Sequence, residues 1–413
     1  MTRYFLLVIA LLSSIYIIAQ DYEQQIEDIA EPEAMERGLS DLMNTWYVKR
    51  YTEKINDDGY KFASMASDSD YIRRLQALPY VIPMPYNPIV RQCIDQYTER
   101  RRNLVEYMLG FESLYFPMIE ESLDKYGLPL ELKYLTIIES ALNTTAFSRA
   151  GAAGLWQFML STAKLYDLEI NSLIDERLNP EKETDAACRF LRDLYNIYHD
   201  WTLALAAYNC GGGNVNKAIH RAGGKTDFWD IYQYLPRETR SYVPYFIAAA
   251  YVMNYFAYHQ LYPVKITAIT ATDTLILTSP VHFEQIAAVL NVDKEEIKAL
   301  NPQYKREIIP GNYKPMPVKL PYNKINKYIS QEQEIIAYNT ETLFPKQNNL
   351  TAYTAGKTTK IIHTVKKDET LLKIGNKYGV TTASIRKWNK LGRKTRQVAV
   401  GRKLMLYVDT GGF

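Results

Sequence analysis

Cysteine is scarce in this sequence. Its 413 residues include only three cysteines, Cys93, Cys188 and Cys210, which allow at most one internal disulfide. A small secreted fold held together by several disulfides is therefore excluded, and packing must stabilise the core. No cysteine lies near the N-terminal end, so we expect no lipid attached through such a cysteine.

A strong overall charge is missing too. The formal net charge is only +3, and the apolar and charged fractions, 47% and 23%, are ordinary for a globular protein with room for two or three domains. The last fifty residues are nevertheless crowded with basic side chains. These are Lys366, Lys367, Lys373, Lys377, Arg386, Lys387, Arg393, Lys394 and Arg396. They indicate attraction to an anionic wall or membrane surface, or a plain solvated face.

Residues 1–20 contain a long apolar run, FLLVIALLSSIYIIA, which follows Arg3 and precedes an acidic stretch. This pattern is typical of a secretory signal peptide and predicts export to the cell envelope or periplasm. The alternative is an uncleaved membrane anchor, because the run is long for a signal and Ile17-Ile18-Ala19 is a poor cleavage site. An exported chain meets little nucleic acid, so we expect no nucleic-acid partner and leave membrane association open.

Helical periodicity dominates residues 96–260 and predicts an all-α domain. Apolar residues recur there at helical spacing: Phe116, Ile119, Leu123, Phe190, Leu191, Leu194, Ile197, Phe246, Ala249, Ala250 and Met253. The apolar stretch 243–258 is interpreted as a buried helix and not as a membrane span, because Pro244 and Asn254 interrupt it. Residues 21–95 are interpreted as a lead-in region of unassigned function.

Two copies of a small module follow the helical domain. Residues 285–302 align without gaps on residues 373–390, so that Asn301 matches Asn389, 88 positions later. Short β-branched runs flank each copy, which predicts a small α+β module in the order strand, helix, helix, strand (βααβ). The expected boundaries are a module at 261–325, a polar linker at 326–360 and a second module at 361–408.

Glu139 is the candidate catalytic residue. It follows Leu135, Ile137 and Ile138 at the end of a predicted helix. Apolar neighbours withdraw water from its carboxyl group, and the helix C-terminus adds partial negative charge, so both effects raise its pKa. A carboxyl group that stays protonated near neutral pH can donate a proton to a glycosidic oxygen. The alternative is a structural glutamate bonded to nearby backbone.

Further candidates for substrate binding lie at helix ends or beside glycines. They are Ser140, Gln157, Phe158, Tyr208, Asn209 and Tyr242. Gly151 and Gly154 permit close backbone approach, and the amide of Gln157 can donate and accept hydrogen bonds, as an acetamido sugar requires. Structural alternatives exist: backbone bonding for Ser140, a tight turn for the glycine segment and core packing for Tyr242.

Two other chemistries are not expected. The glycines at 211–213 are not followed by the Lys-Ser or Lys-Thr pair of a phosphate loop, which argues against nucleotide binding. Cys210 has no nearby histidine in helical register that could activate it as a nucleophile, and it is interpreted as a small buried residue. We expect no cofactor and no metal ion.

Four ordered blocks between residues 96 and 258 resemble the catalytic domain of the lytic murein transglycosylases. The blocks are Glu139-Ser140, Gly154-Leu155-Trp156-Gln157-Phe158, Ala207-Tyr208-Asn209, and Glu238-Thr239-Arg240 with Tyr242-Val243-Pro244. The resemblance implies a multidomain enzyme with a lysozyme-like all-α domain that cleaves the MurNAc-β-1,4-GlcNAc bond of peptidoglycan, with Glu139 as catalytic acid. Residues 361–408 resemble a LysM domain, which binds GlcNAc-containing glycans, and residues 270–320 resemble a degenerate copy.

A glycosidase that uses water normally needs two carboxyl groups, and no obvious second acid accompanies Glu139. The available acids are Asp167, Glu169, Asp175 and Glu238. If Glu139 acts alone, it protonates the leaving oxygen and then deprotonates the C6 hydroxyl of MurNAc, which closes a 1,6-anhydro ring. Two alternatives remain, a hydrolytic muramidase and a catalytically inactive wall-binding scaffold. In each case the expected partner is a peptidoglycan glycan strand.

Overall fold

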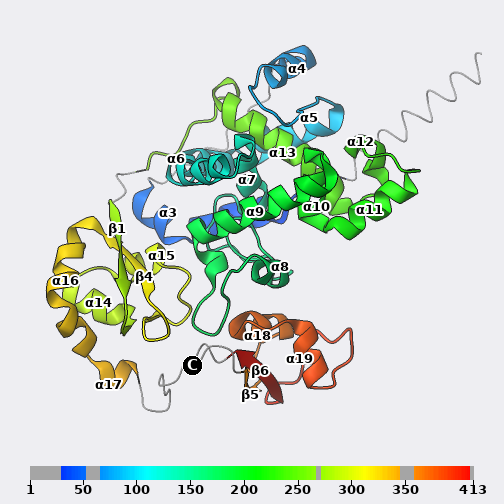
Figure 1. Cartoon of the computed structure of the whole chain (residues 1–413). Helices are drawn as coiled ribbons and strands as arrows, with labels where there is room; N and C mark the ends of the chain where they lie inside the picture. Colours follow the sequence, from blue (N-terminus) through cyan, green and yellow to red (C-terminus); the bar gives the residue numbers. More distant parts are fainter. Residues whose placement is uncertain (1–28, 53–65, 267–270, 345–357, 410–413) are drawn as a thin grey trace, which may run out of the picture. The chain divides into compact units, whose positions relative to one another are not determined.

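Figure 1 shows the computed structural model of the chain, which describes residues 29–52, 66–266, 271–344 and 358–409. These residues divide into two compact units. The first unit contains residues 29–39, 66–141 and 188–264, and the second contains the remainder. The predicted signal peptide at residues 1–20 lies outside the described residues. Within the described ranges, no helix is long and apolar enough to cross a membrane.

The described residues of the first unit form helices and no strand, as the apolar spacing predicts. These are α4 (Asp68–Gln76), α5 (Pro88–Asp95), η1 (Gln96–Arg100), α6 (Arg102–Lys125), η2 (Leu130–Tyr134), α7 (Leu135–Ser140), α10 (Trp201–Cys210), α11 (Gly212–Arg221), α12 (Phe228–Ile231), η4 (Tyr232–Tyr234), α13 (Arg237–Tyr255) and η5 (Phe256–His259). Two further helices, α2 (Glu33–Met43) and α9 (Pro180–Tyr198), each contribute residues to both units.

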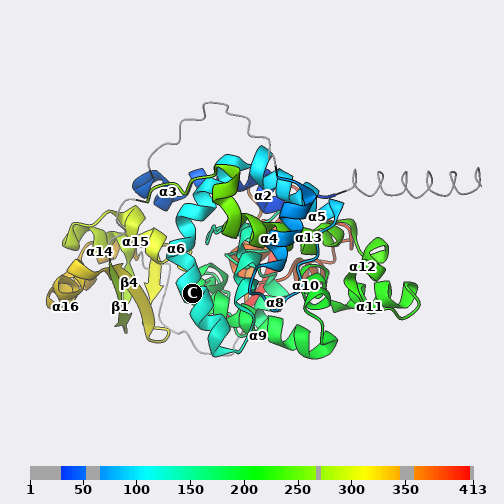
Figure 2. The same cartoon turned by 90° about the horizontal axis from the view of Figure 1, so that it is seen from above.

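Helix α13 forms the centre of the first unit. Its residues are buried without interruption from Ser241 to Met253. Helices α5 and α10 pack against it, as seen from above in Figure 2. Contact on several sides explains why this helix is apolar all round. The interpretation of the apolar stretch that begins at Val243 as a buried helix is therefore confirmed.

The segment between α4 and α5 is fastened to the turn that precedes α7. The carboxylate of Glu131, which is only 3% exposed, accepts the backbone N–H groups of Val81 and Ile82 at 2.6 and 2.7 Å. The hydroxyls of Tyr80 and Tyr134 lie 2.7 Å apart. A buried carboxylate requires such donors, so these bonds make the region before residue 96 part of the helical domain.

The second unit combines residues 142–187 with two small modules. Its helical part contains α3 (Trp46–Tyr51), α8 (Leu160–Leu165), η3 (Glu176–Leu178) and the start of α9. The first module contains β1 (Thr272–Leu277), β2 (Pro280–His282), α14 (Phe283–Leu290), α15 (Lys294–Leu300), β3 (Ile308–Pro310), β4 (Met316–Pro321), α16 (Tyr322–Ala337) and α17 (Thr340–Leu343). The second contains β5 (Thr358–Thr364), α18 (Leu371–Tyr378), α19 (Thr382–Trp388) and β6 (Lys403–Asp409).

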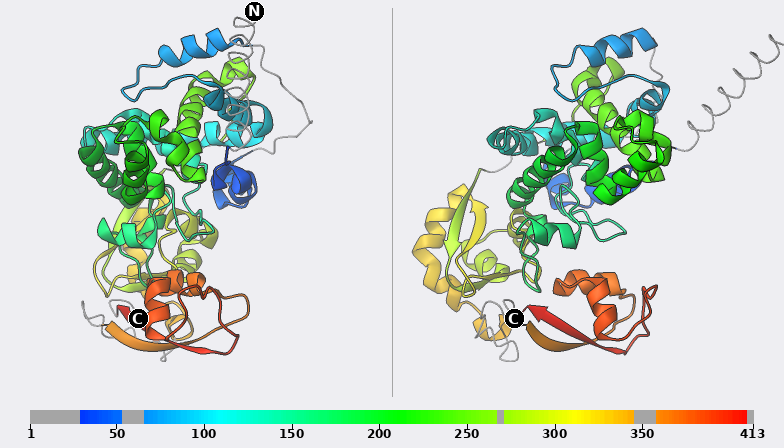
Figure 3. Two further views of the ribbon diagram at one scale, coloured as in Figure 1. Left: turned by 90° about the vertical axis from the view of Figure 1, so that its right-hand side faces the viewer. Right: turned by 45° about the vertical axis from the view of Figure 1, so that its right-hand side comes forward.

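The two modules repeat one arrangement. Helices α14 and α18 begin 88 residues apart, as do α15 and α19. One asparagine in each module joins the second helix to the last strand: Asn301 bonds the backbone of Lys319, and Asn389 bonds that of Met405. The outer strands pair antiparallel, β1 with β4 and β5 with β6. Figure 3 shows this strand pair of the second module, orange to red, beside its two helices.

Helix α16 differs from the sequence prediction of a polar linker that starts at residue 326. The helix continues the first module to Ala337. Tyr328 and Ile335 are 2% and 0% exposed and belong to the core of this module. Both side chains reach this core although Gln331, with a φ of −113°, kinks the helix between them, and the residues between them are mostly polar. The polar composition of this segment therefore did not reveal a kinked helix with only two buried residues, Tyr328 and Ile335.

Candidate active site

Glu139 lies in the last turn of α7, as the sequence predicts. Leu135, Ile137 and Ile138 of the same helix are buried, whereas Glu139 keeps partial solvent exposure. The chain leaves the helix through Ala141, whose φ of 51° lies in the left-handed region. This conformation is uncommon for a residue with a side chain, so the surrounding packing must fix the turn that follows the acid.

Tyr242, near the start of α13, contacts the carboxyl group of Glu139. Its hydroxyl donates to Oε1 of Glu139 at 2.6 Å, although 103 residues separate the two. Burial raises the pKa of Glu139 to about 7, and the hydrogen bond from Tyr242 opposes this rise. No charged group of the described residues contributes to the shift. Glu139 is therefore an acid that holds its proton close to neutral pH.

Tyr208 and Asn209 lie in the last turn of α10. The pKa of Tyr242 is raised by burial and by the nearby Glu139 and Tyr208, so these three side chains form one group. Asn209 is exposed, and its Oδ1 accepts a hydrogen bond from the hydroxyl of Thr239 at 2.8 Å. The sequence analysis named Asn209 as a candidate site residue, and it named Thr239 only within the fourth block of the family resemblance.

Ser140 does not join this group. Its Oγ donates to the backbone carbonyl of Thr136 at 3.1 Å, and the residue is only 4% exposed. This contact is the backbone bonding that the sequence left open as an alternative. A substrate contact through Ser140 stays a prediction.

Gln157 and Phe158 belong to a glycine-rich loop of the second unit, residues 151–158. Gln157 has a φ of 52°, and its side-chain amide donates to the carbonyls of Gly154 at 2.7 Å and Ala146 at 3.3 Å. Phe158 is 2% exposed and packs in the core. The structure thus gives Phe158 a packing role, and a substrate contact through Gln157 stays a prediction.

A buried carboxylate holds this loop from inside, and the sequence analysis did not identify it. Glu183, in the first turn of α9, accepts the N–H groups of Leu155 at 2.7 Å and Trp156 at 3.1 Å. Thr184 accepts the indole N–H of Trp156 at 2.9 Å. Burial raises the pKa of Glu183 well above its ordinary value, and the two N–H donors oppose the rise. Glu183 therefore fixes two consecutive amides of the loop.

Arg177 fixes the two ends of the same loop. Its guanidinium is fully buried, pairs with Asp175 at 2.8 Å, and donates to the carbonyls of Gly151 at 3.0 Å and Phe158 at 3.1 Å. Gly154 lies between these ends with a φ of 91°. A Cβ atom at Gly154 would lie 1.8 Å from the carbonyl oxygen of Arg177, so any side chain there would displace the loop.

Two of the four acids that the sequence offered as second carboxylates form ion pairs, and the other two are exposed. Asp175 forms an ion pair with Arg177, and Glu169 forms one with Lys314 at 2.6 Å. Asp167 and Glu238 are exposed. In the part of the chain that the structure describes, no group of three or more His, Cys, Asp and Glu side chains is arranged to hold a metal ion.

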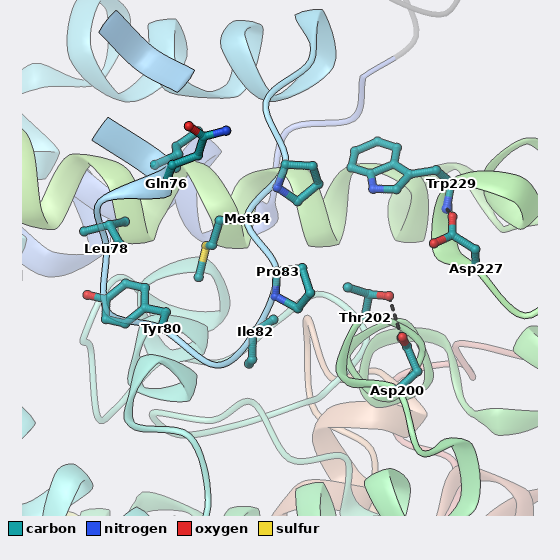
Figure 4. A pocket seen from close by; sticks show the side chains of 12 residues that line it. Gln76, Leu78, Tyr80, Ile82, Pro83, Met84, Asp200, Thr202, Asp227 and Trp229 are labelled. Atoms are coloured by element: carbon teal, nitrogen blue, oxygen red, sulfur yellow. Dashed lines mark hydrogen bonds between the residues drawn. The ribbon is translucent and has the colours of Figure 1, made fainter. Parts of the chain in front are cut away.

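A separate hollow of about 510 Å³ lies in the first unit, between the segment that follows α4 and the N-terminal ends of α10 and α12 (Figure 4). Pro83, Met84 and Trp229 give it an apolar wall. Its acids are engaged as helix caps, because Asp200 accepts from the start of α10 and Asp227 from the start of α12. The group around Glu139 lies at the opposite end of α10, so this hollow is a different place.

Three families match this chain. Residues 117–231 match the family described as Transglycosylase SLT domain, residues 271–337 match the lytic transglycosylase MltD LysM-like domain, and residues 363–406 match the LysM domain. The first match contains Glu139, Gln157, Tyr208 and Asn209. The other two matches fall on the two repeated modules, and the second includes α16.

Similar proteins include curated relatives and solved structures. Membrane-bound lytic murein transglycosylase D of Escherichia coli strain K12 is 31% identical over 315 residues, which are 75% of this chain and 67% of the relative. A putative tributyltin chloride resistance protein of an Alteromonas species is 35% identical over 27% of this chain and 55% of its own length. The structure of the soluble lytic transglycosylase SLT70 of Escherichia coli is 26% identical, with a TM-score of 0.31 over 35% of this chain and 24% of that chain.

Proposed function

Because the chain belongs to the lytic murein transglycosylase family, we propose that Glu139 is its catalytic acid and acts on the bond between MurNAc and GlcNAc in peptidoglycan. The observation that carries this proposal is the contact between Glu139 and Tyr242. In this contact a single neutral donor, the hydroxyl of Tyr242, bonds the carboxyl group of Glu139. Burial raises the pKa of that carboxyl group to about 7. A protonated, partly accessible carboxyl group is what the leaving oxygen of a glycoside requires.

One carboxyl group is sufficient for the proposed reaction. Glu139 gives its proton to the bridging oxygen while the bond from that oxygen to C1 of MurNAc breaks. The resulting carboxylate takes the proton of the C6 hydroxyl of the same sugar, and that oxygen forms a new bond to C1. The products are a free GlcNAc hydroxyl and a 1,6-anhydromuramyl end, no water is consumed, and Glu139 is again protonated. The attacking hydroxyl is already part of the substrate, which supplies proximity.

Tyr242 holds the acid in place and stabilises its carboxylate between the two proton transfers, because its hydroxyl donates to Oε1. Tyr208, Asn209 and Gln157 are proposed to bind the sugars, and the acetamido group of MurNAc is proposed to stabilise the positive charge that develops at C1. Thr239 keeps the side chain of Asn209 in one orientation. The roles of Tyr242, Tyr208 and Asn209 rest on the geometry around Glu139 and on the family, and the role of Gln157 rests on the family.

The second module is proposed to bind the glycan, because residues 363–406 match the LysM domain. Export of the chain, its location at the cell envelope on the periplasmic side and its association with a membrane are proposed from the apolar N-terminal run and from the name of the Escherichia coli relative.

Mass spectrometry of purified sacculi after digestion tests the reaction. We expect muropeptides with anhydro ends, each lighter by one water than the product of hydrolysis. Hydrolysed ends would establish a muramidase and refute the single-acid mechanism. Absence of any soluble product, with sacculus binding retained, would establish a wall-binding scaffold. A parallel digestion of sacculi with the Glu139→Gln variant measures the background of anhydro ends.

A further inference from the structure

The two modules share a fold but differ in charge. In the matched segments, residues 271–337 carry eight basic and eight acidic residues, and residues 363–406 carry twelve basic and two acidic residues. The net charges, without histidine, are therefore zero and +10. In the loop between the second helix and the last strand, residues 301–315 of the first module carry three basic residues and one acidic residue, and residues 389–402 of the second module carry five basic residues and no acidic one.

In the first module this loop is covered by other residues of the second unit. The backbone of Lys305 donates to the carbonyl of Leu173 at 2.8 Å, and Gln303 accepts the N–H of Asp175 at 2.8 Å. The ammonium of Lys305 lies 3.7 Å from the carboxylate of Asp175, and burial lowers the pKa of this lysine to about 8. The loop therefore serves as a packing surface, where Lys305 pairs with Asp175 and Lys314 pairs with Glu169.

In the second module the loop, residues 389–402, carries five basic side chains and no acidic one. All five, Lys390, Arg393, Lys394, Arg396 and Arg402, are exposed, and none forms an ion pair with another described residue. One backbone hydrogen bond occurs at the same place in both modules, and its acceptor residue is acidic in the first module and basic in the second. The first residue of α14 donates to the carbonyl of Glu307, whereas the first residue of α18 donates to that of Arg396.

A second loop lies beside this one and adds to its charge. The N–H of Val365 donates to the carbonyl of Arg402 at 3.0 Å, so the turn that contains the exposed Lys366 and Lys367 adjoins residues 396–402. Glu369 of this turn is directed inward, where it bonds His363 at 2.7 Å. Asp368 remains exposed. The two adjacent loops therefore form a surface of net positive charge, which we call the basic loop pair, residues 366–370 and 389–402.

We propose that the basic loop pair binds the carboxylates of the peptide stems of peptidoglycan, so that the second module selects a peptide-bearing glycan over a neutral one. The proposal rests on the peptidoglycan function proposed above and names the class of strand that the module takes. Guanidinium groups pair with carboxylates in a bidentate geometry, and several cations on one surface attract a polyanion at long range.

A membrane surface is a less suitable occupant. Insertion into a bilayer interface requires apolar side chains beside the basic ones. Among the described residues, Val400 is the large apolar side chain that these loops expose, at 66%. Stem carboxylates are also part of the polymer on which this family acts.

The test uses the full chain with Glu139→Gln, which leaves the polymer intact. Binding is measured by sedimentation with native sacculi, with sacculi whose carboxyl groups have been amidated, and with chitin, which carries acetamido sugars without carboxylates. We expect affinity for native sacculi to exceed that for amidated sacculi about tenfold and to fall with added salt, whereas chitin binding depends little on salt. Equal affinity for native and amidated sacculi would overturn the proposal.

A pair of matched variants localises the effect. Lys394→Gln with Arg396→Gln removes two charges from the basic loop pair, and Lys217→Gln with Arg221→Gln removes two exposed charges from α11. We expect about tenfold weaker binding to native sacculi for the first variant and no change for the second. Vesicles of phosphatidylcholine with phosphatidylglycerol form a further arm, and tighter binding to them than to sacculi would refute the proposal.

Failure of the proposed function gives a different result. If the parent protein binds neither sacculi nor chitin, the module does not bind glycan, and both proposals fall. If it binds chitin and both kinds of sacculi equally, glycan binding stands and carboxylate recognition is wrong.

Discussion

Two glutamates with raised pKa values occupy different regions of the molecule, Glu139 at the end of α7 and Glu183 at the start of α9. Burial raises the pKa in both cases. Glu139 has one phenol as donor and keeps partial exposure, whereas Glu183 is 0% exposed and accepts two backbone N–H groups. The difference teaches that a raised pKa does not by itself identify a catalytic acid. A carboxyl group that can be reached is required as well.

The largest expected effect is loss of cleavage in Glu139→Gln. An amide cannot donate a proton to the bridging oxygen or remove one from the C6 hydroxyl, so we expect release of soluble muropeptides to fall about 1000-fold. Sedimentation with sacculi should show unchanged binding. Residual cleavage within tenfold of the parent protein would remove Glu139 from the mechanism.

The same substitution at Glu183 should act on stability instead. One of the two amides loses its acceptor and faces an NH₂ group, so we expect the free energy of unfolding to fall by about 2–3 kcal/mol in urea titrations. The pH at which cleavage declines should stay where it is in the parent protein. Glu181→Gln, in the same turn but largely exposed and paired with Lys319, is the matched control and should change stability by less than about 1 kcal/mol.

Tyr242→Phe should sharpen the assignment of Glu139. Removal of the hydroxyl deletes a hydrogen bond that stabilises the carboxylate, so cleavage should fall about 10- to 100-fold. This bond opposes the rise in the pKa of Glu139, so the alkaline limb of the pH–rate profile should move to higher pH. The control is Tyr97→Phe, because Tyr97 is buried and its hydroxyl has no hydrogen-bond partner in the described residues. A limb that moves to lower pH in Tyr242→Phe would contradict the assignment.

The smallest expected effect is on the pH dependence of stability. A carboxyl group whose pKa is raised from 4.5 to about 7 binds its proton more tightly in the folded state. Its contribution is complete below pH 4.5 and is lost as the pH rises towards 7. As the pH rises through this window, the free energy of unfolding of the parent protein should fall relative to that of Glu139→Gln by about 1–2 kcal/mol after allowance for solvent screening. Thermal melts of both proteins at pH 5 and pH 8 provide the measurement.

Much of the fold and part of the site could be predicted from the sequence. Apolar spacing places Glu139 in a last helical turn and Tyr242 near a helix start, and the repeat locates both modules. The contact between Glu139 and Tyr242 could not be predicted, because 103 residues separate them and a local sequence pattern does not indicate contacts between residues so far apart in the chain.

Glu183 shows what the sequence analysis overlooked. An acid in a first helical turn is common, because it complements the helix dipole. Glu183, however, stands on the same helical stripe as Ala187 and Leu191, which are both 0% exposed. A charged residue in register with core positions was the available signal for a buried carboxylate. Its acceptance of the loop amides depends on tertiary structure and has no counterpart in the sequence pattern.

The clamp that Glu131 forms on Val81 and Ile82 bears on where the chain can be cut. A fragment that starts at residue 96, or at the family boundary at residue 117, would lack α5. Helix α13, which carries Tyr242, would then lose one of the helices that pack against it. The fragment would also leave a carboxylate without donors in an apolar setting. A shortened enzyme for expression should therefore begin before Ser67, the residue that caps α4.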